Sequence, residues 1–256
     1  MTRVNTRLAA KTARDTSAAS EIVSKAQRVE QLLTVAYGER RWRREDYDTD
    51  IVGALVATIL SQNTSDINSG RAFLNLKAAF PGGWDDVRCA PVSDVANAIR
   101  SGGLADIKAP RIQRVLQLVH AEHGRTDLQH LGQWTDSAVK EYLRGLPGVG
   151  AKTAACVLMF NLGRPALPVD THVHRVSGRL GLIGSKVTAD KAHDILRSLV
   201  RDEQVYSFHV HLIEHGRRTC HAQRPDCSSC AVQAECDFVR GMVGVEQRPA
   251  RKEQVS

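Results

Sequence analysis

The chain has 256 residues, of which 42% are hydrophobic and 25% are charged, a composition typical of a folded globular protein rather than a disordered one. Its formal net charge of +7 favours a polyanionic partner, although a basic surface alone explains only non-specific association. No stretch approaches the ~18 apolar residues that a membrane helix needs, and the N-terminus lacks the apolar core of a secretion signal. We therefore expect a protein of a reducing, cytoplasmic interior.

The two ends of the chain differ in composition from its middle. Residues 1–19 are rich in Arg, Thr, Ala and Ser and contain one acidic residue, Asp15, which predicts a disordered basic arm. An organellar transit peptide has a similar composition and stays open as an alternative. Residues 241–256 are also expected to form a flexible tail.

Apolar residues recur at helical spacing between these ends, and no strand pattern is present. A stripe from Ile22 to Ala36 stops at Gly38, and the almost wholly apolar segment from Ile51 to Leu60 predicts a buried helix. Ser93 and Thr188 are expected as N-caps, and Gly124 and Gly216 as helix ends. Further helices are expected over Asp66–Phe80, Ser93–Arg100, Pro110–His123, Thr135–Arg144, Gly150–Leu162, Thr171–Leu180, Thr188–Val200 and Val205–His215. The fold class predicted is all-α, with roughly ten helices.

A turn rich in glycine joins two of these helices. The sequence Leu146-Pro147-Gly148-Val149-Gly150-Ala151-Lys152 predicts a helix-hairpin-helix. Gly148 and Gly150 can take backbone angles that a side chain would forbid, so the N–H groups of the turn point outward at the start of a helix, where the macrodipole favours an anion. We expect Gly148, Val149 and Gly150 to bind a DNA phosphate. Because such units also serve as plain DNA clamps, the motif alone does not predict catalysis.

Four cysteines near the end of the chain, Cys220, Cys227, Cys230 and Cys236, have the spacing C-x6-C-x2-C-x5-C. In a reducing compartment such a set indicates a metal site rather than disulfides. Zinc is a candidate, because four thiolates suit a tetrahedral ion, but structural zinc sites usually have two short knuckles and this spacing has one.

Five histidines also invite a metal-site interpretation. His211 and His215 are separated by one helical turn, but no H-E-x-x-H motif is present. We attribute them to packing of an amphipathic helix beside the cysteines. The other three are His172, His174 and His209.

The hairpin with Lys152, the later segment Val169-Asp170-Thr171-His172 and the cysteine spacing together resemble the endonuclease III family of DNA glycosylases. The resemblance covers roughly residues 20–240. It implies a six-helix lobe over 45–164 that contains the helix-hairpin-helix, and a second lobe formed by 20–44 and 165–240. It also implies a 4Fe-4S cluster bound by the four cysteines, and a nucleoid-associated monomer with duplex DNA between its lobes.

In that family the residue that matches Lys152 is the nucleophile, and the one that matches Asp170 is its partner. A neutral Lys152 amine would attack C1′ of a flipped nucleotide, displace the base and form a Schiff base that permits β-elimination. Asp170 would stabilise the cationic sugar, and Asp also suits the N-cap of the helix that follows. The start of a helix and partial burial of Lys152 are expected to favour its neutral form.

Two segments resemble those that, in this family, insert side chains into the space that a flipped base leaves in the DNA duplex. In residues 59–66 the position of the family's amide plug falls on Asn63, while Gln62 lies one residue early, so either amide is a candidate. Gly103-Leu104-Ala105 resembles the loop that supplies an apolar wedge. Beside the cysteines, phosphate contacts are expected from Arg217, Arg218 and Arg224.

The sequence therefore predicts a bifunctional DNA glycosylase and abasic-site lyase of base excision repair. By the resemblance, its substrates are oxidised pyrimidines and abasic sites in double-stranded DNA. An adenine-mismatch glycosylase shares the hairpin and the cluster, but that branch does not rely on a lysine at position 152, and its extra C-terminal domain has no room after Cys236. A non-catalytic DNA-binding protein that kept the fold is a third alternative, against which intact Lys152 and Asp170 argue.

Overall fold

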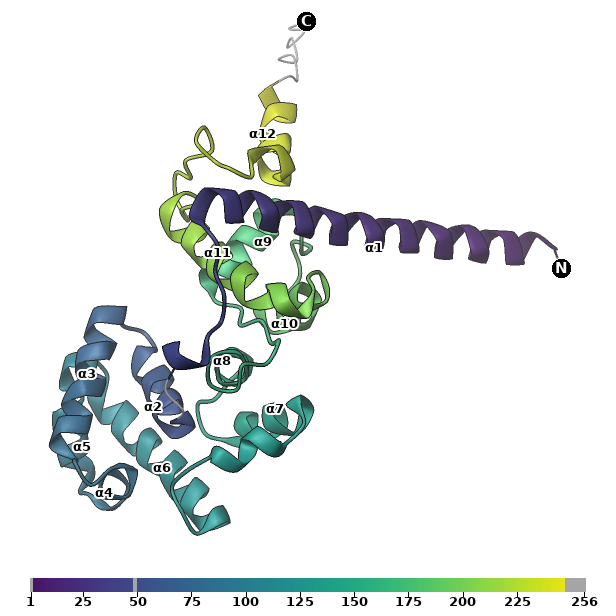
Figure 1. Cartoon of the computed structure of the whole chain (residues 1–256). Coiled ribbons are helices and arrows are strands. Elements are labelled where there is room, and N and C mark those ends of the chain that lie inside the picture. The colour runs from purple at the N-terminus through teal and green to yellow at the C-terminus, as the bar shows by residue number, and fades with distance from the viewer. Residues whose placement is uncertain (1, 48–49, 247–256) are drawn as a thin grey trace, which may run out of the picture. The chain divides into compact units, whose positions relative to one another are not determined.

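The structure, a computed structural model, describes the backbone of residues 2–47 and 50–246 and the side chains of residues 19–47 and 50–241. This part of the chain contains twelve α-helices and no strand (Figure 1), which confirms the all-α prediction. None of its helices is both long and apolar enough to cross a membrane. Most of the tail expected to be flexible, residues 247–256, lies outside the described residues.

The chain divides into two compact units. One unit combines Met1–Arg41 with Val169–Ser256, and the other is Trp42–Pro168. The sequence predicts lobes over 20–44 with 165–240 and over 45–164, with the arm 1–19 and the tail 241–256 set apart from both. Each unit is therefore built from its own helices.

Trp42–Pro168 contains seven α-helices among its described residues, one more than expected, because the short helix Trp84–Cys89 was not predicted. Ser93 was wrongly expected as an N-cap: Pro91 holds that position, and the Ser93 hydroxyl donates to the neighbouring Asp94 carboxylate instead. The helix over 105–123 begins before Pro110, and Gly124 ends it in the left-handed conformation as expected. The helices are α2 (Ile51–Ser61), α3 (Asp66–Ala79), α4 (Trp84–Cys89), α5 (Val92–Ala98), α6 (Ala105–His123), α7 (Asp136–Gly145) and α8 (Ala151–Cys156), which continues as a π-turn over Val157–Asn161.

Helix α2 forms the centre of this unit, and most of its side chains are buried. The Asp50 side chain caps it by accepting a hydrogen bond from the Gly53 N–H at 2.8 Å, and it also accepts one from the Trp84 indole at 2.7 Å. Helices α3 and α6 and the π-turn pack against α2. The end of α2 and the start of α6 are therefore anchored in the core. The loop that follows α2 and the loop that precedes α6 carry residues of the candidate site.

The other unit contains α1 (Thr2–Tyr37), α9 (Thr171–Leu180), α10 (Ala189–Ser198), α11 (Val205–Arg218) and α12 (Asp237–Glu246). Helix α1 includes residues 2–19, for which a disordered arm was expected, and α12 includes part of the expected tail. Residues 2–37 contain neither Gly nor Pro and are rich in Ala, so nothing in them interrupts a helix before Gly38. Thr188 is the N-cap of α10 as expected.

Gly216 does not end α11, contrary to expectation, because the helix continues to Arg218. A Cβ atom at Gly216 would lie 2.9 Å from Cβ of His172 in α9. The glycine therefore permits the close approach of α9 and α11. This packing requirement, and not the end of a helix, explains why a glycine lies at position 216.

A buried pair of side chains joins α1 to α11. The His211 ring is fully buried, with Nδ1 at 3.1 Å from Glu30 Oε2 and Nε2 at 2.9 Å from the Gly38 carbonyl. The Ser207 hydroxyl donates to the other carboxylate oxygen of Glu30. Burial by itself lowers the pKa of His211. The hydrogen bonds to Glu30 and to the Gly38 carbonyl, together with the negative charge of Glu30, outweigh the effect of burial, so the pKa is raised.

We predict that this pair makes stability depend on pH. Because the pKa of His211 is raised in the fold, its contribution is complete below the unfolded value of about 6.5 and is lost as the pH rises through the folded value. Urea unfolding between pH 6 and pH 9 should show this loss. Glu30→Gln should lower the free energy of unfolding at pH 6 by about 3 kcal/mol and remove the part of the pH dependence that comes from the raised pKa of His211.

The matched control is Glu203→Gln, because Glu203 is an exposed carboxylate of the same unit. It should leave the pH dependence of unfolding as in the wild type. Equal pH dependence in the wild type and in Glu30→Gln would contradict the assigned role of the pair.

Candidate functional site

The hairpin lies between α7 and α8, as the sequence predicts. Its turn is closed by a hydrogen bond from the Val149 N–H to the Leu146 carbonyl at 3.1 Å. Gly148 has a φ of 79°, and a Cβ atom there would lie 2.6 Å from Cδ of Arg111. Gly150, by contrast, has extended angles that any residue can adopt, and a Cβ atom there would meet open space. Only Gly148 needs to be glycine for the fold of the hairpin, so the expectation of special angles at Gly150 is wrong.

Two consecutive hydrogen bonds, both made by the Gln62 side chain, support the hairpin. Gln62 donates through Nε2 to the Gly148 carbonyl at 3.1 Å, and its Oε1 accepts from Nη1 of Arg111 at 3.0 Å. Asn63 is exposed at the end of the same segment, with a φ of 54°. The two candidate amides therefore have different surroundings. The Gln62 amide is hydrogen-bonded to the hairpin, and the Asn63 side chain is exposed to solvent. The sequence analysis missed Arg111.

Leu104 precedes α6 in a left-handed conformation with a φ of 51°, and its side chain is 49% exposed. Such a conformation costs most residues with a Cβ atom about 1–2 kcal/mol, and costs Asn less. In the described part of the chain, only Asn63, Leu104 and Arg224 combine a positive φ with a side chain. All three are residues for which we expect DNA contacts. Backbone strain of this kind is concentrated at functional sites.

Lys152 is the second residue of α8 and follows the hairpin directly. Its side chain is exposed, so the expected partial burial is not found. Gly150, the N-cap of α8, offers no side-chain acceptor to the first turn. The lysine amine and the first N–H groups of the helix are therefore accessible from the same end of α8.

Asp170 is the N-cap of α9, as expected. Its Oδ1 accepts a hydrogen bond from the Val173 N–H at 2.7 Å, and the side chain is half-buried. Since one carboxylate oxygen serves as the cap, the second is available for another role. Asp170 belongs to the unit of α9, directly after the boundary at Pro168, and Lys152 to the other unit.

The four cysteines line a single pocket together with Arg179 and His215, and none of them forms a disulfide. Burial raises the pKa of Cys227 and Cys230, and the neighbouring cysteines raise it further. No described group of three or more His, Cys, Asp or Glu side chains is arranged to hold a metal ion. Four thiols that line one pocket and form no disulfide are the donors that both an iron–sulfur cluster and a zinc ion use.

Two arginines of α9 hold the backbone of the cysteine loop. Arg175 donates to the Cys220 carbonyl at 3.0 Å, and Arg179 donates to the His221 carbonyl at 2.6 Å. Arg179 also donates to the Cys220 sulfur at 3.3 Å. The sequence analysis missed both residues, although their spacing of one helical turn places them on the same side of α9.

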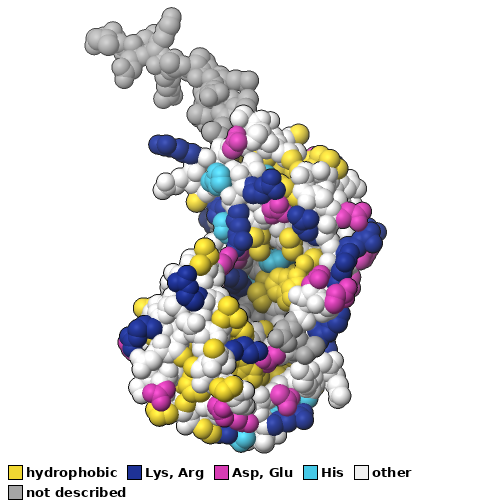
Figure 2. All heavy atoms as spheres, turned by 60° about the vertical axis from the view of Figure 1, so that its left-hand side comes forward, with side chains coloured by type: hydrophobic (Ala, Val, Ile, Leu, Met, Phe, Trp, Pro, Cys, Tyr) yellow, Lys and Arg dark blue, Asp and Glu magenta, His cyan; other side chains and the backbone are white. Residues whose placement is uncertain are grey.

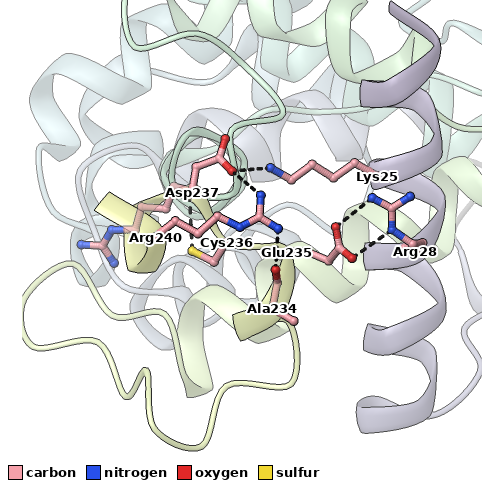
Figure 3. Close-up of polar contacts among 8 residues, drawn as sticks. Lys25, Arg28, Ala234, Glu235, Cys236, Asp237 and Arg240 are labelled. Carbon is pink, nitrogen blue, oxygen red and sulfur yellow. Dashed lines mark hydrogen bonds and ion pairs between the residues drawn. The ribbon is translucent and has the colours of Figure 1, made fainter. Parts of the chain in front are cut away.

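Helix α1 contributes a second support, close to the last cysteine (Figure 3). Lys25 pairs with Asp237 at 2.7 Å, and Arg28 forms two hydrogen bonds with the Glu235 carboxylate at 2.9 and 3.0 Å. Asp237 and Glu235 flank Cys236 in the chain. Each pair joins a largely covered partner, Lys25 or Glu235, to an exposed one, Asp237 or Arg28. The two pairs therefore fix the segment around Cys236 against α1.

The three arginines expected to contact phosphates differ in their surroundings. Arg218 pairs with Glu214 at 2.8 Å and lies 5.1 Å from the Tyr37 ring centre, so its guanidinium is partly engaged. Arg217 and Arg224 are exposed, Arg224 in the loop between Cys220 and Cys227. On the face in Figure 2, Lys and Arg side chains are scattered among acidic ones, so the net positive charge forms no single patch there.

Comparisons with known proteins point to DNA repair. Residues 56–202 match the family model of the HhH-GPD superfamily base excision DNA repair proteins. The chain is 33% identical to endonuclease III of Thermotoga maritima over 78% of its own length and 89% of that protein. It is 39% identical to an Arabidopsis thaliana protein named as a DNA glycosylase, over 73% of this chain but only 60% of that relative. A solved endonuclease III–DNA complex covers 87% of the chain, and the chain covers 98% of it, with a TM-score of 0.73 and 26% identity.

We predict different effects of alanine at the two hairpin glycines. Gly148→Ala should lower the free energy of unfolding by about 1–2 kcal/mol, because the residue needs a positive φ and would press on Arg111. Gly150→Ala is the comparison variant and should cost less, about 0.5 kcal/mol, because only its poorer capping of α8 opposes it. Thermal unfolding of both variants measures the difference. Equal losses would show that the hairpin is not held as described.

Proposed function

Because this chain belongs to the HhH-GPD superfamily of base excision DNA repair proteins, we propose that it is a bifunctional DNA glycosylase and abasic-site lyase. Its partner is double-stranded DNA, and its substrates are oxidised pyrimidines and abasic sites, the class that the resemblance to endonuclease III implies. The observation that carries this proposal is the exposed Lys152 amine directly after a braced hairpin. The 33% identity with endonuclease III of Thermotoga maritima supports it.

In the proposed reaction the hairpin grips the backbone and Lys152 performs the chemistry. The N–H groups around Gly148 and Gly150 bind a phosphate, which sets the position of the flipped sugar. Nζ of Lys152 then forms a bond to C1′ as the glycosidic bond breaks. The base leaves with the electron pair of that bond and takes up a proton, and the attached nitrogen gives up a proton in turn. The C1′–O4′ bond then breaks as O4′ takes up a proton, which opens the sugar and gives a Schiff base between C1′ and Nζ. The Schiff base acidifies C2′, so loss of a proton from C2′ expels the 3′ phosphate.

Asp170 contributes charge rather than a bond. Positive charge develops on the sugar as the bond to the base weakens, and a fixed carboxylate stabilises it. The hydrogen bond from Val173 fixes that carboxylate at the start of α9. The same group can accept and return protons in the steps that follow.

Asn63 and Leu104 are proposed to fill the space that the flipped nucleotide leaves. Both project from strained loop positions and are exposed. Gln62 is engaged with Gly148 and Arg111, so we assign it to support of the hairpin and assign the plug to Asn63. Asparagine is shorter than glutamine, which leaves the plug less reach toward the opposite strand.

We also propose that Cys220, Cys227, Cys230 and Cys236 bind a 4Fe-4S cluster. The pocket that all four line, and the hydrogen bond from Arg179 to the Cys220 sulfur, support this assignment. When bound, the cluster supplies a rigid cross-link of the loop rather than a step of the reaction. The loop then presents Arg224 and its neighbours to DNA phosphates from fixed positions.

We predict that Lys152→Gln abolishes strand cleavage at abasic sites and base release, because it removes the nucleophile. Binding to an undamaged duplex should change less than about twofold, since the backbone N–H groups of the hairpin are unaltered. Gel assays on end-labelled duplexes containing thymine glycol, dihydrouracil or an abasic site measure both activities. Lys191→Gln, which removes an exposed amine elsewhere, is the control and should be fully active. Full activity of Lys152→Gln would sink the proposal.

We predict that Asp170 acts by its charge beyond its role as a cap. Asp170→Asn should unfold like the wild type, because Asn caps a helix about as well as Asp, yet lose most base release. Asp170→Ala should lose base release and also about 1 kcal/mol of stability. If Asp170→Asn kept its turnover per folded molecule, the carboxylate would be structural only.

We predict that the protein purified under anaerobic, iron-replete conditions is brown and contains iron and acid-labile sulfide. The reason is the pocket lined by four free thiols. Metal analysis, sulfide analysis and the visible spectrum measure this. One zinc ion per colourless chain would contradict the cluster assignment and leave the glycosylase proposal standing.

A further inference from the structure

Lys108 is a buried lysine that the proposed reaction does not use. Its side chain is 2% exposed and lies among the apolar residues of α6 that face the core. Nζ donates hydrogen bonds to the Leu60 carbonyl at 2.7 Å and to the Gly102 carbonyl at 2.9 Å. Burial lowers the pKa of this group, and the two hydrogen bonds offset the cost of placing it in the core.

The two carbonyl groups belong to different segments. Leu60 is in the last turn of α2, shortly before Asn63, and its carbonyl is one of those that a helix end leaves without a partner in the helix. Gly102 ends the 3-10 turn Arg100–Gly102, shortly before Leu104. One amino group thus joins the bases of the two loops that carry Asn63 and Leu104, two of the three described residues with a side chain and a positive φ.

We propose that Lys108 is a positioning residue that couples these loops, so that Asn63 and Leu104 enter damaged DNA as one unit. This inference rests on the proposed function and adds a residue to it that no motif contains. Without the shared amino group, each loop would relax separately, and the strained conformations of Asn63 and Leu104 would lose their common support.

The structure provides a matched control on the same helix. Gln113 is 4% exposed, and its Nε2 donates to the Val87 carbonyl at 2.8 Å and to the Ala90 carbonyl at 2.7 Å. It therefore joins two buried carbonyl groups as Lys108 does, but at the connection between α4 and α5, where we expect no DNA contact. Losing either side chain leaves two carbonyl groups unpaired, so the stability losses should be alike.

The test compares Lys108→Met with Gln113→Met on two duplexes, one undamaged and one with a tetrahydrofuran analogue of an abasic site. Thermal unfolding measures the stability of each variant. The ratio of the affinity for the analogue duplex to that for the undamaged duplex should fall about tenfold in Lys108→Met. It should fall less than about twofold in Gln113→Met. The fluorescence of 2-aminopurine opposite the analogue should report the same loss of insertion.

Equal retention of the preference in Lys108→Met and Gln113→Met would contradict the coupling alone. A wild-type protein without any preference for the analogue would instead contradict the proposed function. If Lys108→Met does not fold, the cycle of Asn63→Ala and Leu104→Ala in the wild type decides. Coupled insertion predicts that the double variant loses less than the product of the two single losses, and a simple product would overturn it.

Discussion

The amino group of Lys108 satisfies two buried carbonyl groups at once, those of Leu60 and Gly102. The positions of the two loops that carry Asn63 and Leu104, in the unit Trp42–Pro168, depend on this constraint. An unpaired carbonyl in the core costs about 1–3 kcal/mol, so the loops cannot move apart without that cost. The strained conformations of Asn63 and Leu104 therefore persist at the surface, because the core below them is fixed.

Other functional segments are held in the same way, by long polar side chains that donate to backbone carbonyl groups. Gln62 donates to the hairpin at Gly148, and Arg175 and Arg179 donate to the cysteine loop. A loop lacks the regular hydrogen bonds of a helix, so its carbonyl groups need such partners wherever water is excluded. Binding elements on loops thereby gain the rigidity of the helices that support them.

The local features of this fold could be predicted from sequence, and the tertiary ones could not. Helix α9 has the predicted bounds because its cap, Asp170, and its terminating Gly181 are both adjacent to it in the chain. Gly216, also a glycine, was misinterpreted because its role is a close approach to His172 on another helix. Lys108 resembles a solvated lysine in the sequence, and only its position on the apolar side of α6 signals that it is buried. The motifs gave the candidate residues, and the structure adds what supports them.

Trapping the proposed covalent intermediate tests the central claim most directly. The wild-type protein would be incubated with a duplex containing an abasic site, reduced with borohydride, digested and examined by mass spectrometry. The account predicts one cross-linked peptide, with the sugar attached to Nζ of Lys152. The absence of an adduct, or attachment to any other amine of the chain, would contradict it.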